Sequence, residues 1–409
     1  DIVVNYLKEN GLLEKEELID QNVPRAQRSG GIIEPLPKRH QFFVNVNKII
    51  KERDNKTLKE LMREAVQSGK IKILPERFEK IYFNWIDNLR DWSISRQIWY
   101  GHRLPVWYQQ SADEYIVSKT RPAGDGWVQF SDTLDTWFSS SLWTFSTLGW
   151  PEETADLAMY HPTDVLETAY DILFFWVTKM ILMSEFLIGD IPFKTVYLHG
   201  LVRDEKNRKI SKSLGNNINP LDMIAQYGTD AVRMAMIIGT CVGNDSKVSP
   251  QKFKAYKHFA NKIWNASRFV LENTRGIDTS LSPSFTEQDQ KILSELKRMV
   301  EEVTQDMENF KFYLAAEKIY HYFWHTFADT IIEGAKPRLS APAQGWSASG
   351  RKSEEENTQD KTSAQYMLRE VLTTCLKLLH PFMPFVTEAV WEQVPQKGKK
   401  LLMIEKWPK

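Results

Sequence analysis

The order of extended and helical segments between residues 164 and 238 constrains the fold of this chain more than any other feature. Residues 164–168 are typical of a short buried strand, and residues 171–181 form an almost wholly apolar helix. A second strand is predicted at 193–199 and a second helix at 229–238. A helix that is apolar on most sides must be covered on most sides, as in a layered domain. The alternation therefore predicts an α/β fold with a parallel sheet.

Polar residues follow both predicted strands. Residues 168–171 end the first strand and residues 199–213 follow the second, and ligands of such sheets bind at the carboxyl ends of the strands. Residues 209–213 have the sequence KISKS, with two lysines and two serines. Lysines three apart can place two ammonium groups around one polyphosphate, while hydroxyl and backbone N–H groups hold its other oxygens. Composition alone favours a solvated surface turn, so the position at a strand end is what favours a phosphate site.

Size and composition bound the other possibilities. The 409 residues are too many for one ordinary core and predict two or three domains. Acidic and basic residues number 53 each, so net charge does not point to a nucleic-acid partner. The two cysteines, Cys241 and Cys375, lie far apart, which argues against a disulfide framework and a cysteine zinc site and fits a reducing, cytoplasmic compartment. No apolar run reaches the roughly 18 residues of a membrane span, and neither a P-loop nor a dinucleotide glycine motif occurs.

Three regions of the chain differ in pattern. Residues 1–130 mix short helical and extended runs with many turn residues, residues 131–249 carry the α/β alternation, and residues 250–409 show helical spacing of apolar side chains. A capping box at 284–287 predicts a helix start in the last region. Residues 340–363 are rich in Ser, Gly, Gln, Glu and Lys and predict a flexible loop between two helices. We therefore expect an α/β domain followed by a helical bundle.

Several ordered blocks of this chain resemble one known family. The chain is similar to class I aminoacyl-tRNA synthetases of the branched-chain group over about residues 30–409. Residues 209–213 match the family's K-M-S-K-S signature with Ile210 in place of Met, and residues 261–269 and 380–385 resemble its anticodon-binding domain. The other blocks that carry the likeness are residues 33–36, 41–44, 84–99, 134–143, 170–176 and 199–216.

The resemblance implies a fold and a reaction. Residues 131–249 would form the second half of a Rossmann-like parallel-sheet catalytic domain, and residues 250–409 an all-α helical-bundle anticodon-binding domain. Residues 1–130 would be the remnant of a connective insertion with an acceptor-end region. The implied reaction activates valine with ATP, accompanied by Mg²⁺, and transfers it to tRNA. Valine is favoured because isoleucine-specific members carry an acidic residue where Ser139 stands; an isoleucine-specific ligase and a non-catalytic tRNA-binding paralogue are the alternatives.

By resemblance, the signature loop neutralises charge on the triphosphate. Lys209 and Lys212 would stabilise charge that develops on the β- and γ-phosphates. Ser211 and Ser213 would orient the loop or donate to phosphate oxygens, and Asn216 would belong to the same ATP site. The reaction needs no protein nucleophile, so catalysis would rest on positioning and charge stabilisation.

The resemblance assigns further positions to the substrates. Asp171 would accept hydrogen bonds from the ribose hydroxyls of adenosine, and His199 with Gly200 would let the backbone approach adenine. Trp137 would form a wall of the valine side-chain pocket. An aromatic residue at that position also suits plain core packing, which is the alternative for Trp137.

Three arginines are candidates for a tRNA contact. Arg90, Arg96 and Arg103 could follow the acceptor end of tRNA through phosphate contacts. They could equally pair with Asp87 and Asp91 on a solvated face. The sequence leaves these two interpretations open.

Some features of the family are absent from this sequence. No H-I-G-H motif, which contacts ATP phosphates from the other half of the nucleotide fold, occurs, and Ala169 stands where the family usually has glycine. Cysteines that some relatives use for zinc are replaced near residues 23–31 and after Tyr108, so no metal is expected in a structural site. Because Asp1 is not an initiating Met, we expect the first Rossmann half and an editing insertion upstream of it. We also expect a monomer without membrane contacts that is inactive, or nearly so, by itself.

Overall fold

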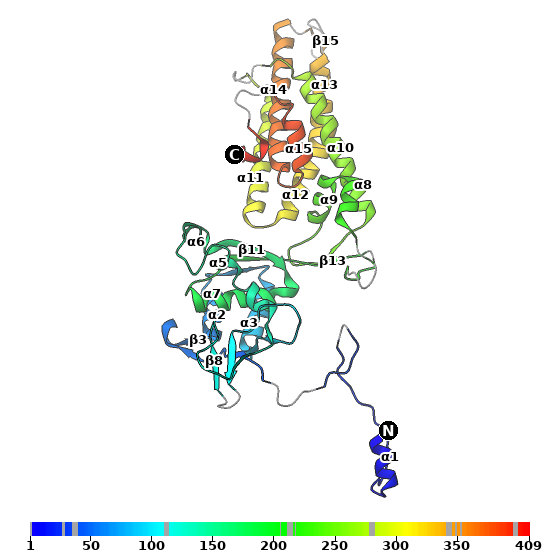
Figure 1. Cartoon of the computed structure of the whole chain (residues 1–409). Coiled ribbons are helices and arrows are strands. Elements are labelled where there is room, and N and C mark those ends of the chain that lie inside the picture. The colour runs from blue at the N-terminus through cyan, green and yellow to red at the C-terminus, as the bar shows by residue number, and fades with distance from the viewer. Residues whose placement is uncertain are drawn as a thin grey trace. The chain divides into compact units, whose positions relative to one another are not determined.

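The computed structural model of the chain is drawn in Figure 1. Its described residues are 2–26, 29–34, 40–109, 114–204, 206–210, 216, 218–277, 283–340, 346–347, 350–351, 354–395 and 400–409. The chain divides into two compact units, Asp1–Asn45 with Asp91–Asp135 and Val46–Arg90 with Thr136–Lys409. No helix among the described residues is both long enough and apolar enough to cross a bilayer.

The first unit is built from short antiparallel pairings. Its elements are α1 (Ile2–Glu9), β1 (Phe43–Val44), β5 (Trp92–Ser93), β6 (Ser95–Arg96), β7 (Val106–Gln109), β8 (Glu114–Val117), β9 (Trp127–Gln129) and β10 (Thr133–Leu134). β7 is the centre of a three-stranded sheet with β8 and β9, while β1 pairs with β5 and β6 with β10. Leu104, Val106 and Trp127 are buried in this unit. Phe42 packs edge-on against Phe130 with ring centroids 5.0 Å apart, which adds an aromatic contact to this small core.

A three-stranded parallel sheet organises the α/β part of the second unit. Its strands lie in the order β11 (Thr163–Ala169), β12 (Phe193–His199) and β4 (Lys72–Leu74). β12 is hydrogen-bonded to both neighbours, and its side chains Phe193 and Val196 are fully buried. The predicted α/β fold with a parallel sheet is therefore confirmed, and β12 has the predicted bounds.

The third strand of this sheet comes from a part of the chain that the sequence pattern had grouped elsewhere. Residues 46–90 belong to the second unit, and Lys72 of β4 pairs with Thr195 of β12. The predicted region 1–130 is therefore wrong for residues 46–90. A strand of three residues is too short for its periodicity to show which sheet it joins.

Helices of the second unit cover the sheet. Seven consecutive residues of α7 (Thr178–Leu187), from Thr178 to Ser184, are buried, as expected for a helix enclosed on most sides. α7 packs against α2 (Leu58–Gln67), whose start is fixed by a capping box between Thr57 and Glu60. The remaining elements of the α/β part are β2 (Ile49–Ile50), η1 (Lys51–Arg53), β3 (Lys56–Thr57), α3 (Arg77–Asp87), α4 (Thr136–Ser140), α5 (Trp143–Ser146), α6 (Ala155–Tyr160), η2 (Tyr170–Ile172), η3 (Leu173–Val177), β13 (Val202–Arg203), α8 (Pro220–Tyr227), α9 (Thr229–Ile237) and β14 (Ser246–Lys247).

The C-terminal part of the second unit is a helical bundle, as predicted. Its elements are α10 (Pro250–Asn273), α11 (Glu287–Glu308), α12 (Phe312–His321), η5 (Tyr322–Ile331), α13 (Ile332–Ser340), β15 (Trp346–Ser347), β16 (Gly350–Arg351), α14 (Glu354–Leu379), α15 (Pro384–Trp391) and η6 (Leu402–Ile404). The long helix α14 packs against α10 and α11 (Figure 1). Phe259, Phe323 and Leu372 from three different helices are fully buried in one apolar core.

Two local predictions in the bundle need correction. The capping box predicted at 284–287 is wrong: the N-cap of α11 is Thr286, whose hydroxyl accepts from the N–H of Asp289 at 3.2 Å, and the Thr286 N–H donates to Ser363 instead of to a side chain of the first helical turn. The predicted flexible loop 340–363 is wrong over residues 354–363, which belong to α14. That stretch is polar, but Glu, Gln and Lys are good helix formers, so a polar composition did not distinguish an exposed helix from a loop.

A buried ion pair links α11 to α13 inside the bundle. Two nitrogens of the Arg338 guanidinium lie 2.7 Å from the two carboxylate oxygens of Asp289, whose side chain is completely buried. Nε of Arg338 also lies 2.8 Å from a carboxylate oxygen of Asp360. Burial acts to raise the pKa of Asp289, but hydrogen bonds from Arg338, Ser363 and Thr286 outweigh it, and the pKa is lowered.

Candidate functional site

Two of the predicted segments meet at the carboxyl edge of the parallel sheet. β11 and β12 run parallel, and Ala169 is paired with His199 at the last position of both strands. The chain leaves the sheet toward Tyr170 and Asp171 from one strand and toward Gly200 from its neighbour. Ligands of open α/β sheets bind at this edge.

A hairpin returns Lys209 to the same edge. Residues 202–204 and 206–210 form the two arms of this hairpin, with Arg203 bridged to Lys209. The Lys209 ammonium lies 3.3 Å from Oδ2 of Asp171, and both side chains are accessible. Two residues that are 38 positions apart in the chain thus face each other at the strand ends. An exposed ammonium group held here is suited to meet a negatively charged ligand.

Asn216 closes the hairpin from the other side of the signature loop. Its amide nitrogen donates to the Lys209 carbonyl at 3.2 Å and to Oδ2 of Asp204 at 3.0 Å. Arg208 also donates to Asp204, through its side chain and its backbone N–H. The hydrogen bond from Asn216, followed by those from Arg208, lowers the pKa of Asp204 to about 2. Asp204 thus receives hydrogen bonds from Arg208 and Asn216, and Asn216 also binds the backbone of Lys209.

The central residues of the signature loop are not part of this description. Ser211, Lys212 and Ser213 lie outside the described residues, while Lys209 and Asn216 on either side of them are described. The roles assigned to the three central residues stay predictions.

His199 and Gly200 are held by neighbouring protein groups. Nε2 of His199 lies 3.1 Å from a carboxylate oxygen of Glu167, and its Nδ1 lies 2.7 Å from the Gly200 carbonyl oxygen. At Gly200, a Cβ atom would stand only 2.0 Å from the carbonyl oxygen of Asn244. Glycine at this position is required by the close approach of another backbone segment, whether or not adenine also binds there.

One carboxylate that the sequence did not point to lies at the centre of this edge. Asp245 accepts hydrogen bonds from the Tyr170 hydroxyl at 2.9 Å and from the Leu201 N–H at 2.8 Å. Nε of Arg203 donates to its other carboxylate oxygen. Burial acts to raise the pKa of Asp245, but the bonds from Leu201, Arg203 and Tyr170 outweigh it and lower the pKa. An aspartate in a short turn has no sequence signal that distinguishes it from an ordinary loop residue.

Aromatic side chains gather around the turn that follows β11. Trp137 of α4 stacks on Phe175 with ring centroids 5.9 Å apart and an interplanar angle of 25°. Trp85 of α3 stacks on Phe174 at 4.5 Å and 27°. Phe175 and Trp85 are both about half exposed, at 50% and 47%. The cluster is compatible with a wall of a pocket and with ordinary packing, the two alternatives for Trp137.

The three candidate arginines differ in what they contact. Arg96 pairs with the buried carboxylate of Asp135 at 2.7 Å. Arg103 donates to the backbone carbonyls of Phe130 and Gln129, both at 2.8 Å. Arg90 is exposed.

The predicted alternative of pairing with Asp87 and Asp91 is wrong for two of these arginines. Arg96 donates to the carboxylate of Asp135 instead, and Arg103 donates to backbone carbonyls. The carboxylate of Asp87 is bound by Arg63. Partners of this kind are 24 to 39 positions apart in the chain, so neighbouring charges in the sequence did not reveal them.

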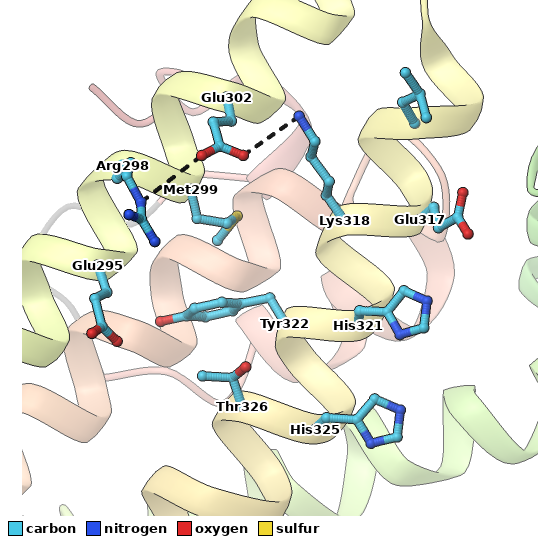
Figure 2. Close-up of a pocket in the computed structure, with 11 residues that line it drawn as sticks. Glu295, Arg298, Met299, Glu302, Glu317, Lys318, His321, Tyr322, His325 and Thr326 are labelled. Carbon is cyan, nitrogen blue, oxygen red and sulfur yellow. Dashed lines mark ion pairs between the residues drawn. The ribbon is translucent and has the colours of Figure 1, made fainter.

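A separate groove lies in the helical bundle between α11 and the continuous helix formed by α12 and η5 (Figure 2). Its volume is about 660 Å³. The Glu302 carboxylate lies between Arg298, at 3.9 Å, and Lys318, at 3.5 Å. The Tyr322 hydroxyl is buried in this region, and burial raises its pKa. Since Glu295 and Glu317 also line the groove, it offers no positive field that would attract phosphates.

Comparison with known families identifies the class of protein to which the fold and the strand-edge site belong. Residues 35–125 and 121–249 match the model of tRNA synthetases class I (I, L, M and V). Residues 289–409 match the anticodon-binding domain of tRNA ligases. The chain belongs to the class I tRNA synthetase family, with a parallel-sheet catalytic portion followed by a helical anticodon-binding region.

The curated relatives narrow the likeness within the class. The valine–tRNA ligase of Thermotoga maritima is 45% identical over 412 aligned residues, which cover 99% of this chain and 44% of the relative. That of Clostridium acetobutylicum is 42% identical over 418 aligned residues, again 99% of this chain and 44% of the relative. The chain thus spans less than half the length of these relatives, and its resemblance to valyl-tRNA synthetases is confirmed.

Solved structures support the fold. A methionyl-tRNA synthetase of Mycobacterium tuberculosis in complex with methionyl-adenylate has a TM-score of 0.64 at 19% identity, covering 81% of this chain and 60% of that one. A LeuRS of Agrobacterium radiobacter K84, solved in a ternary complex with tRNA and LeuAMS, has a TM-score of 0.62 at 20% identity, covering 78% and 42%. At these identities the likeness concerns the fold alone.

Proposed function

We propose that this chain takes part in valine–tRNA ligation by supplying the signature-loop side of the ATP site and a helical tRNA-binding region. The observation that carries the proposal is the pairing of Lys209 with Asp171 at 3.3 Å, at the carboxyl edge of the parallel sheet. Both residues were assigned to ATP by resemblance, and they lie together where such sheets bind ligands. The valine–tRNA ligase relatives supply the substrate class.

The proposed reaction has two steps, and in neither does a protein atom form a covalent bond. A carboxylate oxygen of valine attacks the α-phosphorus of ATP, the bond from that phosphorus to the β-bridging oxygen breaks, and pyrophosphate leaves. A terminal ribose hydroxyl of tRNA then attacks the carbonyl carbon of the valyl-adenylate and releases its proton to solvent, and AMP leaves with the electron pair of the bond that breaks. Because the first step moves negative charge onto the leaving pyrophosphate, fixed positive groups beside it lower the barrier.

Lys209 and Asp171 have complementary parts in this scheme. The Asp171 carboxylate holds the Lys209 ammonium at the strand edge. When ATP binds, the ribose hydroxyls donate to Asp171 and Lys209 turns to the phosphates, with Lys212 joining it. Mg²⁺ enters with ATP as part of the substrate. Among the described residues no three His, Cys, Asp or Glu side chains converge on one point, so the phosphates would supply the metal's principal ligands.

Selection of valine is proposed for the aromatic cluster beside this edge. Trp137, stacked on Phe175, would form a pocket wall, and Ser139 lies on the same short helix α4. A small apolar pocket of this kind distinguishes side chains mainly by size. Replacing Ser139 by Asp should therefore lower the use of valine more than it lowers the affinity for ATP.

For tRNA, the structure leaves Arg90 as the simplest phosphate contact of the three arginines. Arg96 and Arg103 already donate to protein acceptors, whereas Arg90 is exposed. If Arg90 contacts one phosphate, replacing it by Ala should weaken tRNA binding and reduce the salt dependence of the affinity by about one counterion. Filter binding at several salt concentrations measures both effects.

The function is tested by valine-dependent exchange of pyrophosphate into ATP. The chain is assayed alone and after mixing with the portion of the Thermotoga maritima relative that it does not cover. We expect exchange in the mixture and little in the chain alone. The variant Lys209→Ala should lower the exchange rate about 100-fold or more, as expected for removal of a preorganised group that stabilises developing charge.

Lys194 of β12 offers a matched control. Its ammonium pairs with Asp164 at 2.7 Å, near the amino ends of β11 and β12, at the opposite edge of the sheet from Lys209. Lys194→Ala removes the same charge and should change exchange less than twofold. Equal losses for the two lysines would contradict the assignment. Isoleucine-dependent exchange would favour an isoleucine ligase, and tRNA binding without exchange would favour a non-catalytic paralogue.

A further inference from the structure

Asp245 connects two parts of the strand edge that lie far apart in the sequence. Its Oδ1 accepts from the Tyr170 hydroxyl at 2.9 Å and from the Leu201 N–H at 2.8 Å. Its Oδ2 is bound by Nε of Arg203. Tyr170 is 75 positions away in the sequence and directly precedes Asp171. One carboxylate therefore gathers a donor from the end of β11 and two donors from the segment after β12.

The two segments that Asp245 joins carry Asp171 and Lys209, the two residues proposed to bind ATP. Leu201 leads into the hairpin made by residues 202–204 and 206–210, and Arg203, in its first arm, is bridged to Lys209 in the second. Nη1 of Arg203 also donates to the carbonyl of Asn207 at 3.1 Å, inside the hairpin turn. The hairpin that presents Lys209 is thus fastened at its base by the same carboxylate that holds the neighbour of Asp171.

Backbone contacts around Asp245 leave little freedom for this arrangement. β13 pairs in parallel with β14, and the Ser246 N–H donates to the Leu201 carbonyl at 3.0 Å. Gly200 packs so closely on Asn244 that no side chain fits between them. The side chains of Asp245 and Arg203 are only 20% and 27% exposed, so their ion pair is partly shielded from water.

We propose that Asp245 is a positioning residue of the nucleotide site, which holds the Lys209 hairpin in register with Asp171 by binding Arg203 and Tyr170 together. The proposal rests on the proposed function for its chemical consequence, although the positioning itself is a property of the fold. A supporting residue of this kind matters because a reacting group displaced by about 1 Å loses much of its effect. Asp245 touches none of the reacting atoms in this scheme and acts through Lys209.

The variant Asp245→Asn separates the ion pair from the other contacts. Asparagine keeps an oxygen that accepts from Tyr170 and Leu201, but it turns a neutral NH₂ group toward the guanidinium of Arg203, so two donors face each other. We expect hydrogen exchange of the hairpin amides, residues 202–204 and 206–210, to become about tenfold faster in the full chain. The variant Asp164→Asn breaks an exposed ion pair of the same sheet and should leave the exchange of these amides unchanged.

A double-mutant cycle in the pyrophosphate assay tests whether Asp245 acts through Lys209. Asp245→Asn should lower the rate constant kcat of exchange about tenfold while the KM for valine changes less than twofold. In a Lys209→Ala background the same change should have little further effect, because its route of action is already gone. A purely structural role would instead lower kcat by the same factor in both backgrounds.

The outcomes separate this inference from the proposed function. Faster hairpin exchange and a non-additive cycle support the positioning role. If the unchanged chain, mixed with the portion of the Thermotoga maritima relative that it does not cover, shows no valine-dependent pyrophosphate exchange, the proposed function fails. Faster hydrogen exchange of the hairpin in Asp245→Asn would still support the positioning role. Hairpin exchange equal to that of the unchanged chain overturns the inference, as do additive losses. If Asp245→Asn folds poorly, Tyr170→Phe, which removes a single hydroxyl, takes its place. Its hairpin hydrogen exchange and its double-mutant cycle with Lys209→Ala then decide for or against the positioning role.

Discussion

Replacing Gly200 by alanine places a methyl group where another backbone segment already lies. An ideal Cβ at this position would stand 2.0 Å from the carbonyl oxygen of Asn244 and 2.5 Å from the backbone nitrogen of Asp245. Neither atom can turn away as the end of a flexible side chain can, so the segment must shift as a whole. We therefore expect a loss of stability that arises from steric overlap and from the hydrogen bonds broken by the shift.

The expected magnitude follows from these distances. The Asn244 oxygen must move by about 1.4 Å to reach an ordinary contact. A shift of that size breaks the bonds from the Leu201 N–H to Asp245, now 2.8 Å, and from the Ser246 N–H to Leu201, now 3.0 Å. Each lost hydrogen bond costs about 1 kcal/mol, and overpacking adds about 1–3 kcal/mol. Gly200→Ala should thus lower the free energy of unfolding by about 3–5 kcal/mol.

Gly334 provides a control with the same chemical change and the opposite expected sign. It lies exposed within α13, and a Cβ there would meet no atom within 4 Å. Gly334→Ala should stabilise the chain by about 0.5–1 kcal/mol, because alanine loses less backbone entropy in a helix. Urea unfolding of the whole chain, followed by tryptophan fluorescence and circular dichroism, measures both variants. A Gly200→Ala variant within 1 kcal/mol of the unchanged protein would refute the steric argument.

Further predictions concern the bundle and the cysteines. Arg338→Met leaves the buried Asp289 carboxylate without its cation and should lower the free energy of unfolding in urea by about 3–5 kcal/mol. The control Lys336→Met breaks an exposed ion pair on the same helix and should lower it by at most about 0.5 kcal/mol. The pKa of Asp289 is lowered on folding, so the carboxylate stabilises the folded chain fully above the unfolded pKa of about 4 and loses this effect as the pH falls through the folded pKa. Urea midpoints measured between about pH 3 and 7 should show this loss for the unchanged chain and not for Asp289→Asn. Cys241 is exposed, whereas burial raises the pKa of Cys375, so a thiol reagent should modify only Cys241 before unfolding, and rapid reaction of both would contradict the buried position.

The meeting of Lys209 and Asp171 at the strand edge was predictable from the sequence because it depends on local patterns. Lys209 and Asp171 each follow a strand whose apolar pattern is visible, and parallel strands bring their carboxyl ends to one edge. The arginines were less predictable. Arg96 finds its acceptor 39 positions away, at Asp135, and the carboxylate of Asp87 is taken by Arg63, 24 positions away. No local pattern specifies which of several charged neighbours a long, flexible side chain will reach.

By itself, the sequence determined the parallel sheet, the helical bundle and the position of residues 168–171 and His199 at the ends of neighbouring strands. These follow from periodic burial, which each segment expresses in its own residues. Tertiary structure alone decided that β4, from residues 46–90, completes the sheet and that Asp245 joins Tyr170 to Arg203. Such features form only when segments far apart in the sequence come within hydrogen-bond distance. The folding of the whole chain therefore selects the partners, and the propensity of any one segment does not.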